Sequence, residues 1–582
     1  MNLLTKNCQN CNNDFTIEPS DFSFYEKIKV PPPTWCPNCR CVRRMVHRNE
    51  RNLFRRTCDI TGKNIISIYR ADCPYTICDK DYYFSDEFDP FRYGVAYDPS
   101  RTFFEQFYEF AKRVPMTSLF VRNSEKCDYN QDVSGASNCY LCSRTHMSQN
   151  MFYTYRGNKS SDCIDCFQVI EGSEFLYECV NSSASSNSRF IHFCEKCSDS
   201  AFLYNCVGCV DCFMCTDMRN KQYHYQNKQY SPDEYKKIIA SYDLSSYAGQ
   251  QKALAEFEDF LKKFPRKNLT IMRSDNVSGD TIFDSKDCRS VFNVRGSQNC
   301  AYIWDSMSYS DSMDAYSGAR VELVYEATAT TGHTNNCHFC VRVYDGSRDC
   351  EYSWFLQNCS NCFGCISLKD QEYCIFNVHY SKDEYFELLL TIKSKMIEDY
   401  EYGEFFPLYM SPFPYNDTVA QEYFPLTKEK AEKQNLQWGD FEEKNYTPTI
   451  SSESLIDKIE EVPDSILQEI ISCSHNGTCA HGCTKAFRIV PDELSFYRRR
   501  GIPLPRECPN CRYYRRLAYR NPTYVRDTTC MCLGDDAANG VYQNTAAHEH
   551  GTGPCGKDIP TTIPEDSGII IYCNECYKKE VF

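Results

Sequence analysis

The sequence predicts a mainly β protein with some α-helix, in which zinc ribbons at the two ends flank a duplicated, right-handed β-helix-like solenoid with helical insertions. Three observations lead to this fold class. A cysteine motif near the N-terminus recurs near the C-terminus with the same spacing. A cysteine- and aromatic-rich pattern in the middle of the chain recurs 150 residues further on. Short aromatic runs there alternate with Ser, Asn, Asp and Gly, which is typical of stacked solenoid turns.

The motif at each end has the spacing of a pair of zinc knuckles. The run Cys-Pro-Asn-Cys-Arg occupies residues 36–40 and again residues 508–512, and a Phe-Tyr pair precedes each copy at the same distance. An earlier cysteine pair precedes each run, and it is one residue longer in the second copy. Two thiolate pairs can close a tetrahedral zinc site. The predicted ligands are Cys8, Cys11, Cys36 and Cys39 in the first copy and Cys479, Cys483, Cys508 and Cys511 in the second.

A further cysteine module follows the second ribbon. We predict a third metal site from Cys530, Cys555, Cys573 and Cys576, with Cys532, His548 and His550 as additional candidate ligands for one or two sites. The matching N-terminal stretch, residues 77–82, carries Asp81 where the C-terminal copy has a cysteine. We expect apolar residues to stabilise that stretch in place of zinc. The cofactor prediction is therefore about three structural Zn²⁺ ions.

The ribbon motif resembles a known family. The order Cys-x2-Cys, Phe, an acidic residue, Phe-Tyr, Pro and Cys-x2-Cys-Arg is similar to the short zinc-ribbon domains found in many bacterial proteins. The whole chain also resembles large cysteine-rich proteins of small-genome bacteria. The resemblance implies a zinc ion and a small β-ribbon at each end, and it implies no particular activity.

The duplicated middle predicts two solenoid halves, each ending in a helix. Ser231 and Ser381 precede these helices, and serine is a favoured N-cap residue. Internal Cys-x2-Cys pairs, such as Cys163 with Cys166, have two interpretations. Residues i and i+3 of a straight strand face opposite sides, so a shared side requires a corner. The cysteines are then either small buried side chains in a narrow core, which we favour, or metal ligands.

The domain prediction divides the chain into seven segments. They are zinc ribbon copy 1 (1–60), a decayed connecting module (61–118), solenoid half 1 (119–265), solenoid half 2 (266–402), a Pro- and aromatic-rich linker with helices (403–472), zinc ribbon copy 2 (473–529) and a second C-terminal zinc module (530–582). Within the linker, Thr427 to Gln437 and Ser454 to Ile471 are predicted helices. The duplication also suggests that the two ribbons pack on each other.

Basic residues at the two ends suggest a function. The chain has a net charge of −15, yet residues 1–80 and 481–530 are each net positive. Arginines beside a rigid zinc knuckle can contact phosphates, which makes RNA, including ribosomal RNA, the leading predicted partner. The candidate nucleic-acid contacts are Arg40, Arg43, Arg44, Arg48, Arg512, Arg515, Arg516 and Arg520. Intramolecular pairing with the acidic body is an equally weighted alternative, and a protein-interaction scaffold is the second function considered.

The sequence favours a protein without catalytic activity. It contains no GxxxxGK[ST], GxSxG or HExxH motif, and its GxGxxG match at 551–556 follows no strand-like run. A solenoid enzyme acting on a polymer is the third hypothesis. The N-terminal residues lack the apolar segment of a signal peptide, and no apolar stretch is long enough to span a membrane. We therefore expect a cytoplasmic protein with reduced thiols and no membrane partner.

Overall fold

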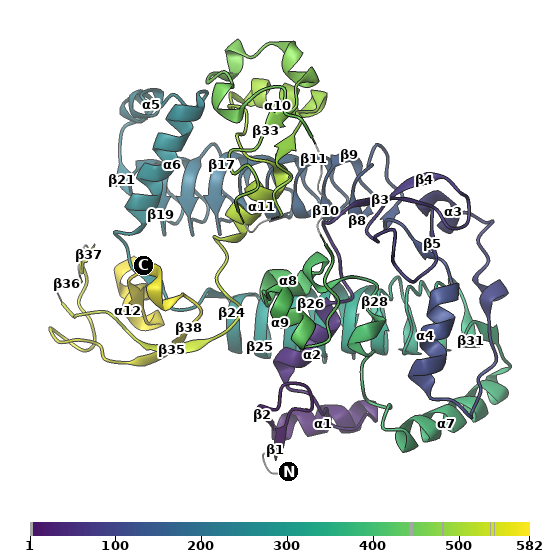
Figure 1. The fold of residues 1–582 in the computed structure, drawn as a ribbon. Coiled ribbons are helices and arrows are strands. Elements are labelled where there is room, and N and C mark those ends of the chain that lie inside the picture. The colour runs from purple at the N-terminus through teal and green to yellow at the C-terminus, as the bar shows by residue number, and fades with distance from the viewer. Residues whose placement is uncertain (1–3, 441–445, 480–481, 536, 540–541, 582) are drawn as a thin grey trace. The chain divides into compact units, whose positions relative to one another are not determined.

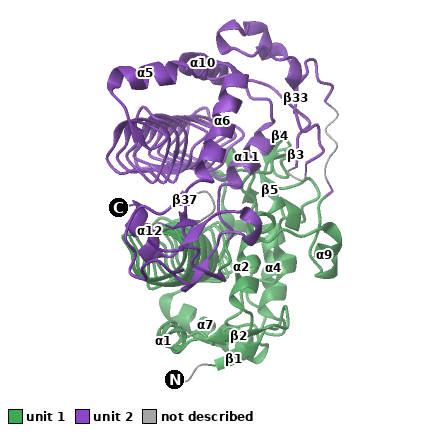
Figure 2. Ribbon diagram, turned by 90° about the vertical axis from the view of Figure 1, so that its left-hand side faces the viewer, with its two compact units in different colours: residues 1–119, 269–439, 523–525 green, residues 120–268, 440–522, 526–582 purple. Residues whose placement is uncertain are grey.

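The computed structural model describes residues 4–440, 446–479, 482–535, 537–539 and 542–581, and it confirms the predicted fold class. The chain forms two compact units, coloured separately in Figure 2. Unit 1 comprises residues 1–119, 269–439 and 523–525, and unit 2 comprises residues 120–268, 440–522 and 526–582. Each unit therefore combines one terminal ribbon with the solenoid half that is more distant in the sequence. The expectation that the two ribbons pack on each other stays a prediction.

The first solenoid belongs to unit 2 and consists of short parallel strands (Figure 1). Each strand pairs with the strand one turn later, as Ser143 does with Tyr155. The strands are β7 (Val121–Arg122), β8 (Gln131–Ser134), β9 (Ser137–Tyr140), β10 (Ser143–His146), β11 (Gln149–Phe152), β12 (Tyr155–Asn158), β13 (Ser161–Ile164), β14 (Phe167–Ile170), β15 (Glu174–Tyr177), β16 (Val180–Ser183), β17 (Ser186–His192), β18 (Ala201–Tyr204), β19 (Val210–Thr216) and β20 (Gln222–Tyr225), closed by the antiparallel β21 (Lys228–Gln229).

The second solenoid belongs to unit 1 and repeats this plan with longer strands. Its strands are β23 (Ile271–Met272), β24 (Asp275–Phe283), β25 (Lys286–Arg295), β26 (Gln298–Ser310), β27 (Met313–Glu322), β28 (Tyr325–Val341), β29 (Arg348–Glu351), β30 (Ser360–Phe363), β31 (Glu372–Ile375) and the antiparallel β32 (Val378–His379). Figure 2 shows the turns stacked one behind another.

Every third solenoid residue is a corner. Residues 138, 141, 144, 147 and 150 all have positive φ, between 49° and 52°, and the pattern continues through both solenoids. A residue in the left-handed conformation turns the chain at each corner. The residues directly after successive corners are three positions apart, and they all face the interior. Asn and Asp tolerate this conformation best among residues other than glycine. This geometry supplies the corner that a Cys-x2-Cys pair needs in order to share one side.

The interior of the later turns of the second solenoid, from residue 337 to residue 374, is largely a stack of cysteines. Cys337, Cys340, Cys350, Cys359, Cys362, Cys365 and Cys374 form one buried cluster with Val343, Leu356 and Leu368. Their thiols donate to main-chain carbonyls, as Cys340 does to the carbonyl of His338 at 3.2 Å. Burial raises the pKa of the Cys340 thiol to about 12, so it stays protonated. These contacts fit the small-core interpretation of the internal cysteine pairs.

The outer corners carry ladders of Asn and Asp. The side-chain amide of Asn336 donates to Asp349 at 2.7 Å, and Asn358 donates to Asp370 at 2.7 Å. In the first solenoid, Asn150 donates to Asp162 at 3.2 Å. Each ladder links one turn to the next, so these carboxylates stabilise the stack through amide donors.

Helices follow both solenoids at the predicted positions. Ser231 caps α5 (Pro232–Ala240), and Ser381 caps α7 (Lys382–Glu398); each serine forms a capping box with the glutamate three residues later. Unit 2 continues with α6 (Tyr247–Leu261) and β22 (Arg266–Lys267), and unit 1 also contains α3 (Lys80–Tyr83), η1 (Pro90–Tyr93), α4 (Phe103–Arg113), β5 (Ile77–Cys78) and β6 (Met116–Thr117).

The linker contains shorter helices than predicted. Thr427 does cap a helix, but α9 ends at Lys433. The predicted helix from Ser454 to Ile471 is wrong, because Pro463 interrupts the segment and two separate 3-10 turns, at Ile459–Glu461 and Asp464–Gln468, form in its place. The linker elements are η2 (Leu408–Met410), η3 (Tyr415–Asp417), α8 (Val419–Tyr423), α9 (Lys428–Lys433), η4 (Ser452–Ser454), η5 (Ile459–Glu461) and η6 (Asp464–Gln468). Among the described residues, no helix combines the length and apolarity that a membrane span needs.

Candidate metal centres

The first ribbon brings its four predicted ligands together. It comprises β1 (Leu4–Asn7), β2 (Asp14–Ile17), α1 (Pro19–Ile28) and α2 (Pro37–Met45), followed by β3 (Phe54–Thr57) and β4 (Asn64–Ser67). The sulfurs of Cys8, Cys11, Cys36 and Cys39 lie within 4.8 Å of one another. A tetrahedral zinc with Zn–S bonds of about 2.3 Å separates its sulfurs by about 3.8 Å. The Sγ atoms of Cys11 and Cys36 are 3.8 Å apart, so the donor set fits zinc.

Main-chain and thiol hydrogen bonds prepare this site for a cation. The backbone N–H of Cys36 donates to the Cys8 sulfur at 3.2 Å. The hydrogen bond with Cys39 lowers the pKa of the Cys36 thiol to about 5. Cys36 is also the N-cap of α2, and Pro37 occupies the first helical position. The metal would therefore fix the first turn of α2.

The second ribbon forms a comparable group with one unexpected member. It comprises β33 (Ile471–Ser472), β34 (Ala486–Phe487), α10 (Pro491–Arg500) and α11 (Pro509–Leu517). Cys473, Cys483, Cys508 and Cys511 lie within 4.8 Å of one another. The Cys508–Cys511 and Cys473–Cys511 sulfur distances are 3.6 and 3.8 Å. This tetrad contains three of the predicted ligands and replaces Cys479 with Cys473.

Cys473 takes the place of Cys8, and the segment from Cys473 to Cys483 is seven residues longer than the segment from Cys8 to Cys11. The N–H of Cys8 donates to the carbonyl of Asn13, and that of Cys473 donates to the carbonyl of Lys485, 472 residues beyond Asn13. A constant offset applied to Cys8 therefore misses Cys473. The signal that could have identified Cys473 is its position directly after the short apolar run that forms β33. The predicted ligand Cys479 lies close by, 3.5 Å from the Cys511 sulfur, in an alternative group with His475.

The C-terminal module assembles the predicted third site. Cys530, Cys555, Cys573 and Cys576 lie within 4.8 Å of one another. The module comprises β35 (Arg526–Thr529), β36 (Ala538–Asn539), β37 (Tyr542–Gln543), β38 (Asp558–Thr561), η7 (Glu565–Ser567), β39 (Ile571–Tyr572) and α12 (Asn574–Val581). The backbone N–H of Cys573 donates to the Cys530 sulfur at 3.1 Å. A second group, formed by Cys532, His548, His550 and Cys576, lies beside it.

The corresponding N-terminal module has lost this cluster. Cys58 accepts a hydrogen bond from the N–H of Asp79 at 3.2 Å, just as Cys530 does from Cys573. Asp79 therefore stands where the C-terminal copy has Cys573, so the sequence alignment that set Asp81 against Cys576 is wrong by one residue. The Asp79 carboxylate caps α3 by accepting a hydrogen bond from the N–H of Asp81. Neither the described residues around Cys58 nor Asp81 belong to a group of three or more metal-ligand candidates.

The arginines that follow Cys39 in the first ribbon point into the second solenoid. Arg43 and Arg44 each place a guanidinium nitrogen 2.9 Å from a Glu326 oxygen, and Arg40 lies 2.8 Å from Asp314. All five side chains are buried. Asp314 and Glu326 occupy corners of successive turns, with φ of 53° and 45°. Helix α2, which follows Cys36 and contains Cys39, is therefore anchored by buried ion pairs to β27 and β28.

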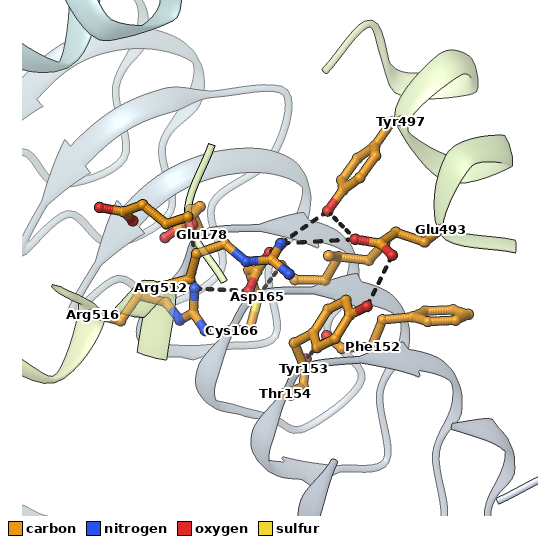
Figure 3. Close-up of polar contacts among 12 residues, drawn as sticks. Phe152, Tyr153, Thr154, Asp165, Cys166, Glu178, Glu493, Tyr497, Arg512 and Arg516 are labelled. Carbon is orange, nitrogen blue, oxygen red and sulfur yellow. Dashed lines mark hydrogen bonds and ion pairs between the residues drawn. The ribbon is translucent and has the colours of Figure 1, made fainter. Parts of the chain in front are cut away.

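The second ribbon repeats this contact on the first solenoid (Figure 3). Arg516 lies 2.9 Å from Asp165 and 3.2 Å from Glu178, and Arg512 pairs with Asp165. Asp165 and Glu178 are again corner residues of successive turns, with φ of 54° and 53°. Arg512 also donates to the Tyr497 hydroxyl at 3.1 Å, and the hydroxyls of Tyr497 and Tyr153 both donate to the Glu493 carboxylate (Figure 3). The two units thus contain equivalent anchors.

The basic residues considered as nucleic-acid contacts have partners within the protein. Arg40, Arg43, Arg44, Arg48, Arg512 and Arg516 are buried, and Arg515 is partly buried and pairs with Glu178 at 2.8 Å. Arg48 pairs with Glu50 at 2.6 Å, and Arg520 lies over the ring of Phe167. The arginines are thus engaged within the protein, as the alternative of intramolecular pairing expects, and these positions do not support nucleic-acid binding.

Glu326 and Glu178, two of the carboxylates paired with these arginines, stay ionised. Burial raises the pKa of Glu326, but the combined effect of Arg43, Arg44 and Arg40 lowers it by a larger amount. The net pKa therefore lies below its ordinary value. Burial also raises the pKa of Glu178, and Arg515 and Arg516 lower it by more, so the net pKa of Glu178 lies below its ordinary value as well. Several guanidinium groups per carboxylate thus offset the cost of removing these charges from water.

His47, two residues after the end of α2, is expected to make unit 1 sensitive to acid. The ring is buried against Trp354 and Phe405, and burial lowers its pKa to about 3. An unfolded histidine titrates near about 6.5, so the unfolded state binds the proton first and stability falls as the pH drops below that value. His47→Phe is expected to reduce the loss of unfolding free energy between about pH 7 and 4.5 by about 2–3 kcal/mol. Urea titrations followed by tryptophan fluorescence measure this difference.

The control for this experiment is His333→Phe, since His333 is exposed on β28. Both variants keep every thiol, so acid-induced zinc loss affects them alike. An unchanged pH dependence in His47→Phe would contradict a neutral buried imidazole.

Comparisons with known proteins leave the family open. The chain matches no protein-family model and no curated protein. Among solved structures it is similar to one provisionally assigned as an acetyltransferase from Desulfovibrio desulfuricans, at 9% identity, covering 46% of this chain and 71% of that one, with a TM-score of 0.10. A similarity this weak carries no argument about activity. The cysteine tetrads and the solenoid are therefore what the structure establishes, and the resemblance to zinc-ribbon families stays an expectation.

Proposed function

We propose that the protein is a non-enzymatic, zinc-stabilised scaffold that binds a partner protein through helix α7 of unit 1. The observation that carries this proposal is an exposed apolar stripe on α7. The side chains of Phe386, Leu390 and Ile397 are 46%, 70% and 59% exposed. Their spacing places them on one face of the helix. Contiguous apolar groups exposed on a soluble surface mark interaction sites more often than isolated ones do.

The duplicated helix α5 supports a specific role for this stripe. The residues equivalent to Phe386 and Leu390, 150 positions earlier, are Lys236 and Ala240. Both are exposed, and α5 keeps the same serine cap and capping box without exposed large apolar groups. The fold of the helix therefore does not require Phe386 or Leu390 to be apolar.

The charges around the stripe favour a basic amphipathic helix of a partner protein. Asp383, Glu387 and Glu398 are exposed on α7, and the whole chain is acidic. An antiparallel pair of two α7 helices crossing at Leu390 would place Asp383 beside Glu398 of the second copy, and like charges disfavour that arrangement. A helix with apolar residues at i and i+4 flanked by Lys or Arg complements both features.

The buried arginines support a protein partner over RNA. The side chains that led to the nucleic-acid hypothesis are engaged by Asp314, Glu326, Asp165 and Glu178. Binding phosphate through them would require breaking buried ion pairs, which costs several kcal/mol for each uncompensated charge. The acidic surface of the rest of the chain also repels a polyanion.

The test is binding of a labelled basic amphipathic peptide, followed by fluorescence anisotropy. We expect the wild-type protein to bind it, Leu390→Asp to weaken binding at least about ten-fold, or about 1.4 kcal/mol, and the matched control Ala240→Asp in α5 to have no effect. Equal binding by wild type and Leu390→Asp would overturn the proposal.

Two parallel measurements separate the competing partners. Sedimentation of the wild-type protein as a dimer that Leu390→Asp dissociates would identify a second copy as the occupant. Tight binding of a labelled single-stranded RNA that weakens steeply with salt would replace the scaffold with the nucleic-acid hypothesis.

A further inference from the structure

A second group of ligand side chains adjoins the third cysteine tetrad. Cys532, His548, His550 and Cys576 have donor atoms within 4.8 Å of one another, and Cys576 also belongs to the tetrad with Cys530, Cys555 and Cys573. Of these side chains, Cys532, His548 and Cys576 are buried. The two groups therefore share one thiol.

His548 is oriented as a ligand by a buried carboxylate. Its Nε2 atom lies 2.8 Å from Glu580, whose side chain is fully buried. Glu580 is itself positioned by the Tyr542 hydroxyl and the N–H of Thr545, both at 2.8 Å. With Nε2 donating to the carboxylate, Nδ1 keeps its lone pair, and it lies 3.7 Å from the Cys532 sulfur. A carboxylate behind an imidazole is the usual support of a metal-ligating histidine.

His550 is oriented in the same way through its other nitrogen. Its Nδ1 atom donates to the carbonyl of Gly553 at 2.8 Å, and Nε2 lies 3.4 Å from the Cys576 sulfur. Zn–S and Zn–N bonds of about 2.3 and 2.1 Å separate nitrogen and sulfur by about 3.6 Å in a tetrahedral site. Both histidines match that separation, so their available nitrogens converge with Cys532 and Cys576.

We propose that the C-terminal module holds two zinc ions, with the Cys576 thiolate bridging them. One ion is bound by Cys530, Cys555, Cys573 and Cys576, and the other by Cys532, His548, His550 and Cys576. Five thiolates against two divalent ions give a net charge of −1, so sharing one thiolate avoids collecting a sixth negative charge. Glu580 is a positioning residue in this site.

Metal counting and chelator competition test the two ions. We expect four zinc ions per chain: one in each ribbon and two in the C-terminal module. His548→Asn and Cys532→Ser should each lower the content to three, and the control His333→Asn should keep four. Glu580→Gln should retain four but release one ion to a chelator about 10–100 times more readily. Three ions in the wild-type protein, or four in both ligand variants, would overturn the second site.

Cobalt substitution tests the bridge. Two Co²⁺ ions that share a thiolate couple magnetically, so the paramagnetic resonance signal of the filled protein should fall below the sum for four isolated ions. Cys532→Ser, which leaves the module with one ion, should restore the full intensity per bound cobalt. A wild-type signal equal to that of four isolated ions would overturn the bridge while leaving the zinc count unaffected.

Discussion

Replacing Glu326 with Gln is expected to lower the free energy of unfolding of unit 1 by about 3–5 kcal/mol. Glu326 lies 2.9 Å from both Arg43 and Arg44, and all three side chains are buried. Glutamine keeps the size of the side chain but removes its charge, so Asp314 and Glu404 are left to neutralise Arg40, Arg43 and Arg44. An uncompensated buried charge is among the costliest single changes in a folded protein.

Tryptophan fluorescence during urea unfolding measures this loss selectively. The four tryptophans of the chain, at positions 35, 304, 354 and 438, all belong to unit 1. The control Glu322→Gln changes an exposed glutamate at the end of β27 and should shift stability by less than about 0.5 kcal/mol. Glu178→Gln removes the equivalent charge from unit 2, so its effect should be visible by circular dichroism and absent from the tryptophan signal. A change below about 1 kcal/mol in Glu326→Gln would contradict the anchor.

Disrupting the proposed zinc site of the first ribbon is expected to release α2 from the second solenoid. Structural zinc sites in small domains contribute about 10–16 kcal/mol of apparent binding free energy. The candidate ligand Cys36 is the N-cap residue of α2. Cys39→Ser should therefore lower the zinc content by one ion per chain. It should also expose Arg40, Arg43 and Arg44, which are buried in the intact protein. Trypsin cleavage after these arginines, followed by mass spectrometry, should accelerate at least about ten-fold, which equals about 1.4 kcal/mol of opening free energy.

The matched control is Cys362→Ser in the second solenoid. Cys362 is buried and donates to the Ser360 carbonyl at 3.5 Å, and serine occupies equivalent inner positions at residues 347 and 353. This variant should keep its full zinc content and its resistance to trypsin. Loss of zinc from Cys362→Ser would make the solenoid itself a metal-binding body, and an intact zinc content in Cys39→Ser would contradict the first site.

The local parts of this structure could be predicted from sequence because their geometry is set by short spacings. A Cys-Pro-Asn-Cys run fixes a knuckle and the start of a helix within five residues. Serine followed three residues later by glutamate identifies the starts of α5 and α7. Repetition at a constant offset then indicates the solenoid without any knowledge of its partners.

The long-range parts could not be predicted in this way. Nothing near Arg44 in sequence identifies Glu326 as its partner, since 282 residues separate them. An arginine that binds phosphate and one that pairs with a buried glutamate have the same local sequence, so only the three-dimensional contact distinguishes them. The exchange of Cys479 for Cys473 has a related cause, because an insertion between Cys473 and Cys483 breaks the constant offset.

The interleaving of the two units determines the order in which the chain can become complete during synthesis. Unit 1 draws its last large segment from residues up to 439, whereas unit 2 begins at residue 120 and also needs the segments 440–522 and 526–582. A ribosome thus produces Asp165 and Glu178 well over 300 residues before Arg512 and Arg516. Until then, the nascent first solenoid carries two corner acids without the cations that cover them. Premature termination within the last ribbon would leave that surface permanently uncovered, whereas unit 1 would already contain all its large segments. The exposed surface of such a truncated chain would therefore belong to the solenoid that is made first.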